Sequence, residues 1–457
     1  MAYLFNTPED QREMLQAIGA ASIEELFAGI PKELRLGRPL AIPAPMAEAE
    51  LTLHMSGLAR RSQGSGELVC FLGGGAYDHF IPATVDALAG RGEFFTSYTP
   101  YQPEVSQGNL QVMFEYETMI CQLTGMDVSN ASLYDGASAC VEAVLLALSV
   151  SHSRRQVIVC ESLHPEYRQA LATYLQFLDA ELITLPAKAG CLELETLRAA
   201  LKSDSTACVV LSQPNFFGVV EDLAPAAALA KESGAVVVAV ADMLSLGCLQ
   251  SPGLWGADVV VGEGQPLGIP LQFGGPYLGI MACREALVRR MPGRIAGQTT
   301  DRHGERCWVL TLQTREQHIR RDRATSNICT NQGLLALRAT IYLSLLGPHG
   351  LQETAAQCAW KTAYLSDALA NHDRWEVVFP GSNWREIVLR DTTGDVESVV
   401  QHAQLHGLLA GLPLGRWYPH MSDCLLVAVT EKRSRSEIDK LVDVLTQAPS
   451  LLESTRA

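Results

Sequence analysis

The chain has 457 residues, of which 47% are hydrophobic, and a formal net charge of -15. This length predicts more than one compact core. The acidic balance argues against general nucleic-acid binding, because phosphate neutralisation needs a basic surface. No run approaches the roughly 18 uninterrupted apolar residues of a membrane span, so we also expect no membrane partner.

The first thirty residues contain Asp10, Glu13, Glu24 and Glu25, with no basic start followed by an apolar block. This is unlike a secretory signal or an Arg-rich transit peptide, so we expect a cytoplasmic location. The 12 cysteines include no CxxC pair. They predict buried thiols in a reducing compartment, with neither a metal site nor a disulfide framework.

Helical pieces open the chain, PEDQREMLQAIG and SIEELFAGI, followed by a Pro-rich stretch around IPAPMAEAE. They predict an N-terminal helical arm over residues 1–60. From about residue 110, strand-like runs rich in Val, Ile and Leu alternate with helical segments such as PEYRQALATYLQFL. The runs are QVIVC, AELITLP, CVVLSQP, AVVVAVAD, ADVVVGEG and YLGIMAC. Continuous apolar strands between helices predict a mainly parallel sheet covered on both faces, here a large α/β domain over residues 61–330.

A Gly/Arg-rich stretch lies near residues 293–325, and two long helical segments follow it. They lead to the strand-like runs EVVF, REIVLR and CLLVAV and to a last helical segment, SEIDKLVDVLTQA. This tail predicts a small C-terminal α/β domain over residues 331–457.

Ligands of an open parallel sheet bind beyond the carboxyl ends of its strands, and three features fall there. The turn Asp135, Gly136, Ala137 and Ser138 precedes a helix of small and apolar residues. Free backbone N–H groups at such a helix start suit a phosphate. A plain capped turn is the alternative.

The other two features are a histidine and an aspartate. His164 comes four residues after QVIVC and would lie over a flat cofactor ring, or it simply opens a surface helix. Asp242 ends AVVVAVAD, where a carboxylate would hold a protonated pyridine nitrogen, or where it caps the next helix. A phosphate turn, a histidine and a strand-end aspartate, in this order, resemble the large domain of fold-type I pyridoxal phosphate (PLP) enzymes.

Such enzymes carry a lysine at the end of the following strand, but no lysine occurs between Lys231 and Lys361. The expected position falls on Pro266, in GADVVVGEGQPLG. A Schiff base needs a primary amine, so we predict that this chain alone has no catalytic residue of that kind and binds no PLP covalently. The turn, His164 and Asp242 would then be vestigial cofactor contacts. The run FLGGGAYDHF holds glycines but follows no clear βα pattern, so we do not interpret it as dinucleotide-binding.

Long motifs across the chain resemble the P-protein family of the glycine cleavage system. They are YTPYQPEVSQG, HIRRDRATSNICTNQ, GLLAGLPLGRWYP and LLVAVTEKR. In many bacteria this protein is split into two related chains, and the present one resembles the α chain, subunit 1. The β chain carries a His-Lys pair where this chain has Gln265 and Pro266.

The resemblance implies a glycine decarboxylase in which the β partner chain holds the PLP. Glycine loses CO2, and its aminomethyl group passes to the lipoyl arm of the H-protein in an expected α2β2 assembly. Because active sites of this fold lie at subunit interfaces, two segments become candidates for completing the partner's site. The candidates are Tyr98, Thr99, Tyr101, Glu104 and Gln107 in the first segment, and Arg320, Arg321, Arg323, Thr325 and Asn327 in the second.

Three alternatives remain open. The first segment would be a loop stiffened for packing, the arginines would pair with local acids such as Glu316 and Asp322, or the whole chain would be a purely structural docking subunit.

Overall fold

The computed structural model of the chain describes residues 5–151, 153–324, 326–328, 331–370 and 372–448. The chain divides into two compact units, residues 1–62 and residues 63–457. The first unit contains α1 (Pro8–Ile18), α2 (Ile23–Leu26), a short 3-10 turn, Lys32–Leu34, and α3 (Glu48–Ala59). Thr7 caps α1 by accepting a hydrogen bond from the Asp10 N–H. None of the described residues of this unit is buried, so its helices form no core of their own.

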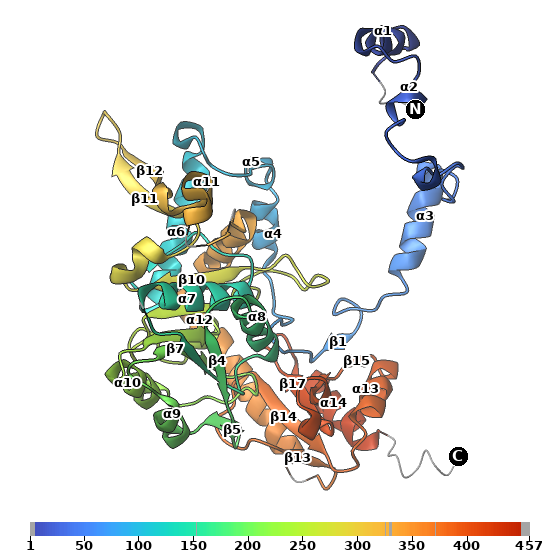
Figure 1. Ribbon diagram of the computed structural model, residues 1–457. Helices are drawn as coiled ribbons and strands as arrows, with labels where there is room; N and C mark the ends of the chain where they lie inside the picture. The colour runs from blue at the N-terminus through green and yellow to red at the C-terminus, as the bar shows by residue number, and fades with distance from the viewer. Residues whose placement is uncertain (1–4, 152, 325, 329–330, 371, 449–457) are drawn as a thin grey trace. The chain divides into compact units, whose positions relative to one another are not determined.

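A seven-stranded mixed sheet organises the second unit, in the order β2-β10-β9-β8-β7-β3-β4 (Figure 1). Strands β4, β3, β7, β8 and β9 run parallel, and β10 is antiparallel to its neighbours β9 and β2. All six predicted strand-like runs form strands of this sheet. The bounds are β2 (Val128–Ser129), β3 (Gln156–Cys160), β4 (Glu181–Leu185), β7 (Thr206–Gln213), β8 (Val236–Ala241), β9 (Val259–Glu263) and β10 (Gly279–Cys283).

Helices cover both faces of the main sheet, as its apolar strands require. On one face, α7 and α8 pack on Val157, Val159 and Val261. The other face packs on α6 and α12 through Val260 and its neighbours, and on α9 and α10 through Val209. The helices are α4 (Ala83–Ala89), α5 (Gly92–Phe95), α6 (Gln107–Thr124), α7 (Gly136–Val150), α8 (Pro165–Leu175), α9 (Leu194–Ala200), α10 (Ala224–Glu232), α11 (Gln317–Arg320) and α12 (Gly333–Leu369).

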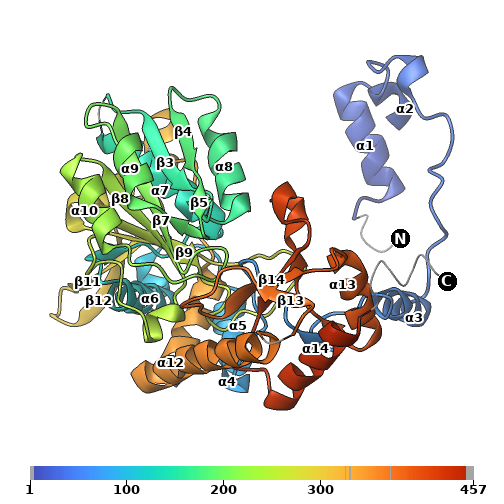
Figure 2. The same cartoon turned by 90° about the horizontal axis from the view of Figure 1, so that it is seen from below.

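A smaller antiparallel sheet, β13-β14-β17-β16, follows α12. Figure 2 shows α13 and α14 beside it, and their apolar side chains share a core with β14 and β17. The bounds are β13 (Trp375–Val377), β14 (Glu386–Asp391), α13 (Val396–Leu405), β15 (Leu408–Leu409), β16 (Leu412–Pro413), β17 (Cys424–Ala428) and α14 (Arg435–Gln447). Two hairpins are separate from both sheets, β5 (Ala187–Lys188) with β6 (Cys191–Leu192) and β11 (Ile295–Thr300) with β12 (Arg306–Thr311).

Two elements link parts of the second unit that lie far apart in the chain. Strand β1 (Val69–Cys70) lies early in the chain but pairs in parallel with β15 near its end. Helix α12 kinks at Gly347, where φ is 59°, and contributes Leu335 to one core and Leu369 to the other. The predicted boundary between residues 330 and 331 therefore stays a prediction, because these elements belong to both parts.

One helix within the described ranges, α12, is long and apolar enough to cross a membrane by length and composition. Its buried residues Leu335, Ala339 and Tyr342 form part of the hydrophobic core. A core helix of a globular protein passes the same test, so this length alone carries no further conclusion.

Candidate functional site

A cavity of about 80 Å³ lies beyond the carboxyl ends of the central parallel strands. The structure brings the predicted residues His164, Asp242 and Pro266 together in its wall. No lysine is among the residues that line it in the described part of the chain. Other lining residues include Gly75, Tyr77, Tyr167, Ser212, Asn215, Phe216, Glu263, Trp384, Arg385 and Glu386.

The predicted phosphate turn does begin a helix, but the N–H donors of Gly136 and Ser138 are already engaged. Asp135 caps α7 by accepting a hydrogen bond from the Ser138 N–H at 2.7 Å. The Gly136 N–H donates to the Glu263 carboxylate at 2.9 Å. Glu263 also accepts hydrogen bonds from two further backbone N–H groups, those of Gln265 and Leu278. A carboxylate of this chain therefore lies where a phosphate was expected.

The electrostatics of Glu263 reflect its position. Burial raises the pKa of Glu263 to about 7, although the backbone hydrogen bond from Gly136 and two others lower it. The space is also narrow, since a Cβ built on Gly136 would lie 1.9 Å from the Tyr167 hydroxyl. Only glycine fits at this helix start.

Asp242 lies at the end of β8 as predicted, and both of its carboxylate oxygens are engaged. One accepts hydrogen bonds from the N–H groups of Leu244 and Ser245, at 2.9 and 3.1 Å. The other forms an ion pair with Arg385, which immediately precedes β14. Burial alone would lower the pKa of Arg385, but Asp242 and nearby groups raise it, so the guanidinium stays charged. Asp242 therefore caps a turn, as the alternative expected, and its other oxygen is held by a cation of the protein itself.

The imidazole of His164 is engaged by the loop that precedes α4. Its Nε2 lies 2.7 Å from the Gly74 carbonyl, and its Nδ1 accepts a hydrogen bond from the Glu166 N–H. Nε2 therefore carries the proton and donates it to Gly74. Burial lowers the pKa of His164, which favours this neutral form. The ring stacks on Tyr167 at 4.9 Å, so its face is covered by a side chain of this chain.

The run FLGGGAYDHF supplies part of the wall that the sequence alone did not assign. The N–H of Gly74 and the hydroxyl of Tyr77 both donate to the Glu386 carboxylate, at 2.7 and 2.8 Å. A Cβ on Gly73 would lie 2.2 Å from Glu386, so the close approach requires glycine here. Gln265 closes the other side, exchanging hydrogen bonds with the backbone of Tyr77.

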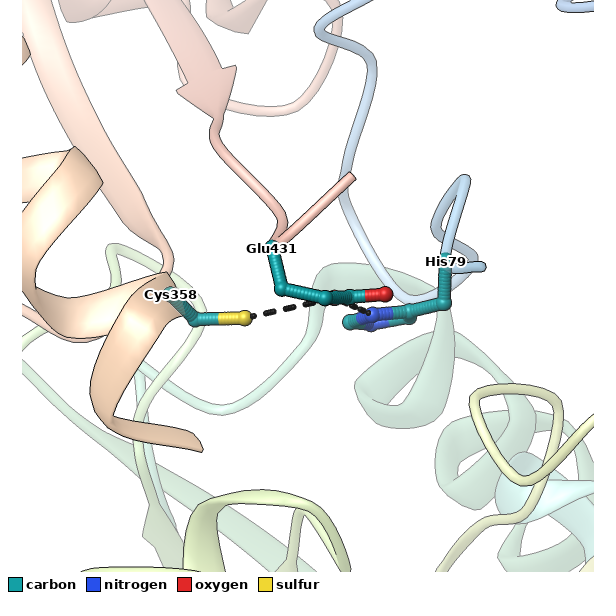
Figure 3. A group of neighbouring side chains, drawn as sticks. All are labelled: His79, Cys358 and Glu431. Carbon is teal, nitrogen blue, oxygen red and sulfur yellow. Dashed lines mark hydrogen bonds and ion pairs between the residues drawn. The ribbon is translucent and has the colours of Figure 1, made fainter. Parts of the chain in front are cut away.

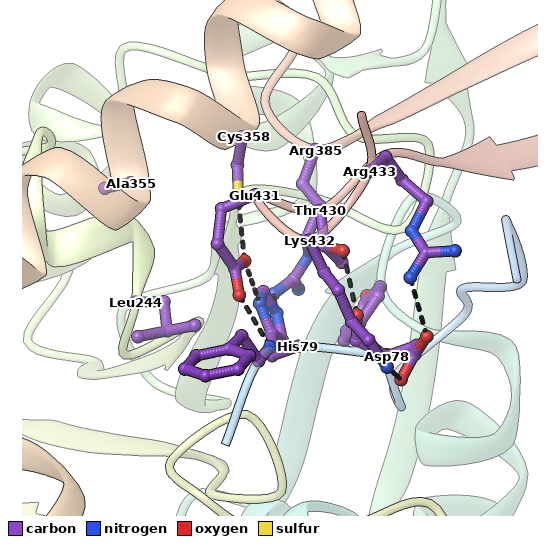
Figure 4. A network of polar contacts seen from close by, with 12 residues as sticks. Asp78, His79, Leu244, Ala355, Cys358, Arg385, Thr430, Glu431, Lys432 and Arg433 are labelled. Carbon is purple, nitrogen blue, oxygen red and sulfur yellow. Dashed lines mark hydrogen bonds and ion pairs between the residues drawn. The ribbon is translucent and has the colours of Figure 1, made fainter. Parts of the chain in front are cut away.

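Arg385 continues into a second polar cluster, drawn in Figures 3 and 4. The ligand atoms of His79, Cys358 and Glu431 lie within 4.8 Å of one another, a geometry that merits testing as a metal site. Arg385 Nη1, which can only donate, lies 3.1 Å from His79 Nε2. His79 Nε2 must therefore accept, and Nδ1 donates its proton to Glu431 at 2.5 Å. A metal ion on Nδ1 would displace this proton beside a guanidinium, so the cluster fits a hydrogen-bonded chain better than a cation.

PLP does not fit the cavity in this arrangement. The helix start that would hold its phosphate is bound by Glu263, and the aspartate that would hold its ring nitrogen is bound by Arg385. Two buried carboxyl groups, Glu263 and Glu386, would also face the phosphate or the ring. We therefore derive no chemistry through a cofactor held by this chain.

The two motif segments predicted to complete a partner's site are brought together elsewhere in the second unit. The Tyr101 and His318 rings are 6.1 Å apart, and buried Arg294 lies 5.6 Å from the Tyr101 ring centre. Gln107 joins the first segment to β12, because its amide binds the Trp308 backbone through both its oxygen and its nitrogen. Gln107 therefore positions the loop and has no free amide for a ligand.

Most of the remaining predicted residues face solvent. Tyr98 is 83% exposed and Tyr101 58% exposed, large values for aromatic side chains. The other exposed candidates are Glu104, Arg320, Arg321, Arg323 and Asn327, whereas Thr99 is half-buried. Thr325 lies outside the described residues.

The alternative, pairing of these arginines with local acids, is not seen among the described residues. Within the described ranges, no ion pair joins Arg320, Arg321 or Arg323 to an acid, whereas Glu316 lies 3.9 Å from Arg294. Arg315 instead donates to backbone carbonyls, including that of Gly293 at 3.0 Å. We define the exposed face as the exposed side chains of Tyr98, Tyr101, Arg320, Arg321 and Arg323.

Comparison with known proteins decides the family. The model of the glycine cleavage system P-protein matches residues 1–445. The chain is 49% identical over 442 residues to a probable glycine dehydrogenase (decarboxylating) subunit 1 of Desulforamulus reducens, covering 96% of this chain and 98% of the relative. For the same subunit of Moorella thermoacetica, the identity is 50% over 442 residues, with 97% and 98% covered. The chain belongs to the glycine cleavage system P-protein family.

Solved structures agree with this P-protein assignment. The crystal structure of a glycine decarboxylase (P-protein) of the glycine cleavage system, in inhibitor-bound form, superposes with a TM-score of 0.87 at 42% identity, covering 98% of this chain and all of that one. A sphingosine-1-phosphate lyase of Burkholderia pseudomallei has a TM-score of 0.66 at 15% identity, covering 93% and 97%. A cysteine desulfurase of Escherichia coli has a TM-score of 0.63 at 15% identity, covering 86% and 96%.

The last two relatives show the fold alone. The predicted fold-type I PLP-dependent enzyme fold, α/β with a mainly parallel sheet, is confirmed. As a P-protein of the subunit 1 type, the chain is a subunit of a glycine dehydrogenase (decarboxylating), an oxidoreductase.

Proposed function

We propose that this chain is the α subunit of a two-chain glycine decarboxylase that works only with a lysine-bearing β partner. The reaction converts glycine and the lipoylated H-protein into CO2 and the aminomethyl-dihydrolipoyl H-protein. In this proposal the partner binds PLP covalently, and the present chain binds none. The assembly is α2β2 and cytoplasmic, with no nucleic acid or membrane among its partners.

The observation that carries this proposal is which residues line the cavity. Pro266 lies in the cavity wall, at the position where the family resemblance leads us to expect the partner's lysine, and it has no amine to offer. Glu263 and Arg385 fill the two positions that would hold phosphate and ring nitrogen. The chain therefore contributes to catalysis through other surfaces.

The exposed face is our candidate for that contribution. It combines two exposed tyrosines with three arginines that form no ion pair with an acid among the described residues. Guanidinium groups bind carboxylates and phosphates in bidentate geometry, so this face suits glycine's carboxylate, the phosphate of a partner-held PLP, or acids of the H-protein. The cation–π contact of Arg294 helps to hold Tyr101 in place.

A purely structural subunit is the second candidate. The Gln107 amide makes its hydrogen bonds to the backbone of this chain. This favours a structural role for that part of the loop. The two candidates differ in what surface substitutions do to turnover within an intact assembly.

The test uses the reconstituted two-chain enzyme with Arg323→Ala and Tyr101→Ala, each in the full chain. Arg302→Ala, which alters an exposed arginine at the tip of the β11–β12 hairpin, is the matched control. We expect turnover to fall by about tenfold or more for the first two, since a charge-assisted hydrogen bond is worth about 1.5–3 kcal/mol. Normal turnover of an intact assembly for both variants would favour the purely structural role.

A further inference from the structure

We infer that this chain's cofactor-like cavity is a self-occupied site, in which Glu263 takes the place of a phosphate and Arg385 that of a protonated ring nitrogen. This goes beyond the proposed function, because it concerns what the cavity binds and not what the partner does. It predicts that removing the internal occupants, and not adding a lysine, creates a binding site for phosphate esters.

The phosphate half of the argument rests on hydrogen bonds. Glu263 accepts from three backbone N–H groups, those of Gly136, Gln265 and Leu278, at 2.9–3.0 Å. Three converging N–H groups, one of them at a helix start, are the arrangement that binds an oxyanion. Here the group that accepts these hydrogen bonds is the Glu263 carboxyl, which is tethered to β9, so no ligand from solution is needed.

The ring half rests on Asp242 and Arg385. The guanidinium pairs with the carboxylate and lies 3.2 Å from the centre of the Tyr77 ring and 4.6 Å from that of Trp384. A flat cation between an aromatic face and a strand-end carboxylate reproduces the environment of a pyridinium. Arg385 is 2% exposed, and its Nε has no hydrogen-bond partner in the described part of the chain. The guanidinium of Arg385 therefore does not satisfy all of its donors in this cavity, as expected if the cavity was shaped for a different group.

The backbone supports the same reading. Arg385 has a φ of 61°, a backbone conformation that residues other than glycine rarely adopt. Such strain persists only where surrounding contacts hold it, and it is concentrated at ligand and active sites. The contacts that hold it here are Asp242, His79 and Tyr77.

The experiment compares four full-length proteins: wild type, Glu263→Ala, Glu263→Ala with Arg385→Leu, and Glu221→Ala. Glu221 is the matched control, because it is another half-buried glutamate that accepts a backbone hydrogen bond, from Leu192, away from the Gly136 helix start. Binding of inorganic phosphate is measured by the shift in Tm, and binding of PLP by equilibrium dialysis. Circular dichroism checks folding, and Glu263→Ser replaces Glu263→Ala if the latter does not fold.

We expect phosphate to raise the Tm of Glu263→Ala but not of wild type or Glu221→Ala. PLP is expected to bind Glu263→Ala at least about tenfold more tightly than wild type, because its phosphate can accept the charge-assisted hydrogen bonds that Glu263 accepts in wild type. The double variant should bind PLP more tightly still, with no further gain for inorganic phosphate. Equal binding by wild type and Glu263→Ala, or no gain in any variant, would overturn the inference.

Discussion

Arg385 forms a buried ion pair with Asp242, and this contact joins the start of β14 in the smaller sheet to the end of β8 in the main sheet. Replacing Arg385 by Met leaves a carboxylate without its cation in a mostly buried position. We expect a loss of about 3 kcal/mol in the free energy of unfolding, measured by urea denaturation.

The control for this prediction is Arg390→Met. Arg390 pairs with Glu376 at the protein surface, where ion pairs contribute less than about 1 kcal/mol. If the two variants lose the same free energy of unfolding, the Arg385–Asp242 ion pair stabilises the fold no more than a surface ion pair does.

A second prediction concerns pH and Glu142, on α7. Burial raises the pKa of Glu142 to about 7 from 4.5, against a hydrogen bond from Ser326. Because the folded state holds this proton more tightly than the unfolded state, stability from Glu142 is present below pH 4.5 and is lost as pH rises to about 7. Glu142→Gln removes this loss. The free energy of unfolding of the variant should therefore rise by about 3 kcal/mol relative to wild type as the pH increases from 4.5 to 8.

Urea denaturation at several pH values measures this difference. Glu115→Gln, at an exposed position on α6, serves as the control and should show no such trend. A constant difference between Glu142→Gln and wild type from pH 4.5 to 8 would contradict the assignment.

A third prediction concerns zinc at His79, Cys358 and Glu431. As long as Arg385 occupies His79 Nε2, we expect purified protein to bind zinc below one equivalent at micromolar concentration. Arg385→Met frees His79, so zinc affinity should increase in that variant, and Cys358→Ala should cancel the increase. Isothermal titration measures both, and stoichiometric zinc in wild type would contradict the hydrogen-bonded reading.

A fourth prediction concerns the first unit, residues 1–62. Its exposed apolar side chains include Phe5, Leu34 and Ile42, at 91%, 75% and 71% exposure. The hydrophobic clusters of the described residues draw only on residues beyond 62, so a chain starting at Gln63 should keep its fold. Exposed apolar surface of this extent favours a protein partner, so the truncated chain should bind the β chain at least tenfold more weakly. Unchanged affinity in analytical ultracentrifugation would assign the unit another role.

Local patterns in the sequence predict much of this fold for a physical reason. A strand buried on both faces must be apolar along its length, so runs such as AVVVAVAD are visible without any partner. The same rule places Asp242 at the strand end, because the first polar residue after such a run lies at the edge of the sheet.

The occupants of the cavity could not be predicted in this way. Glu263 contacts Gly136 across 127 residues of sequence, and Arg385 contacts Asp242 across 143. No local pattern encodes such separations, and the positive φ of Arg385 has no sequence signal because the residue is not glycine. One clue was present, since Glu263 is an acidic residue at the end of an apolar strand, next to Gln265 and Pro266.

The two candidate groups separate in the structure, and this could be anticipated only from the family. The cavity residues face one another within this chain, whereas Tyr98 and the arginines face solvent. In the proposed assembly a second chain covers this aromatic and cationic face.

Co-expression of this chain with its lysine-bearing relative tests the central proposal most directly. Release of labelled CO2 from carboxyl-labelled glycine, with lipoylated H-protein, is measured for each chain alone and for the copurified complex. We predict copurification and release by the complex only. Release by this chain alone, or its covalent labelling by PLP and borohydride, would contradict the account.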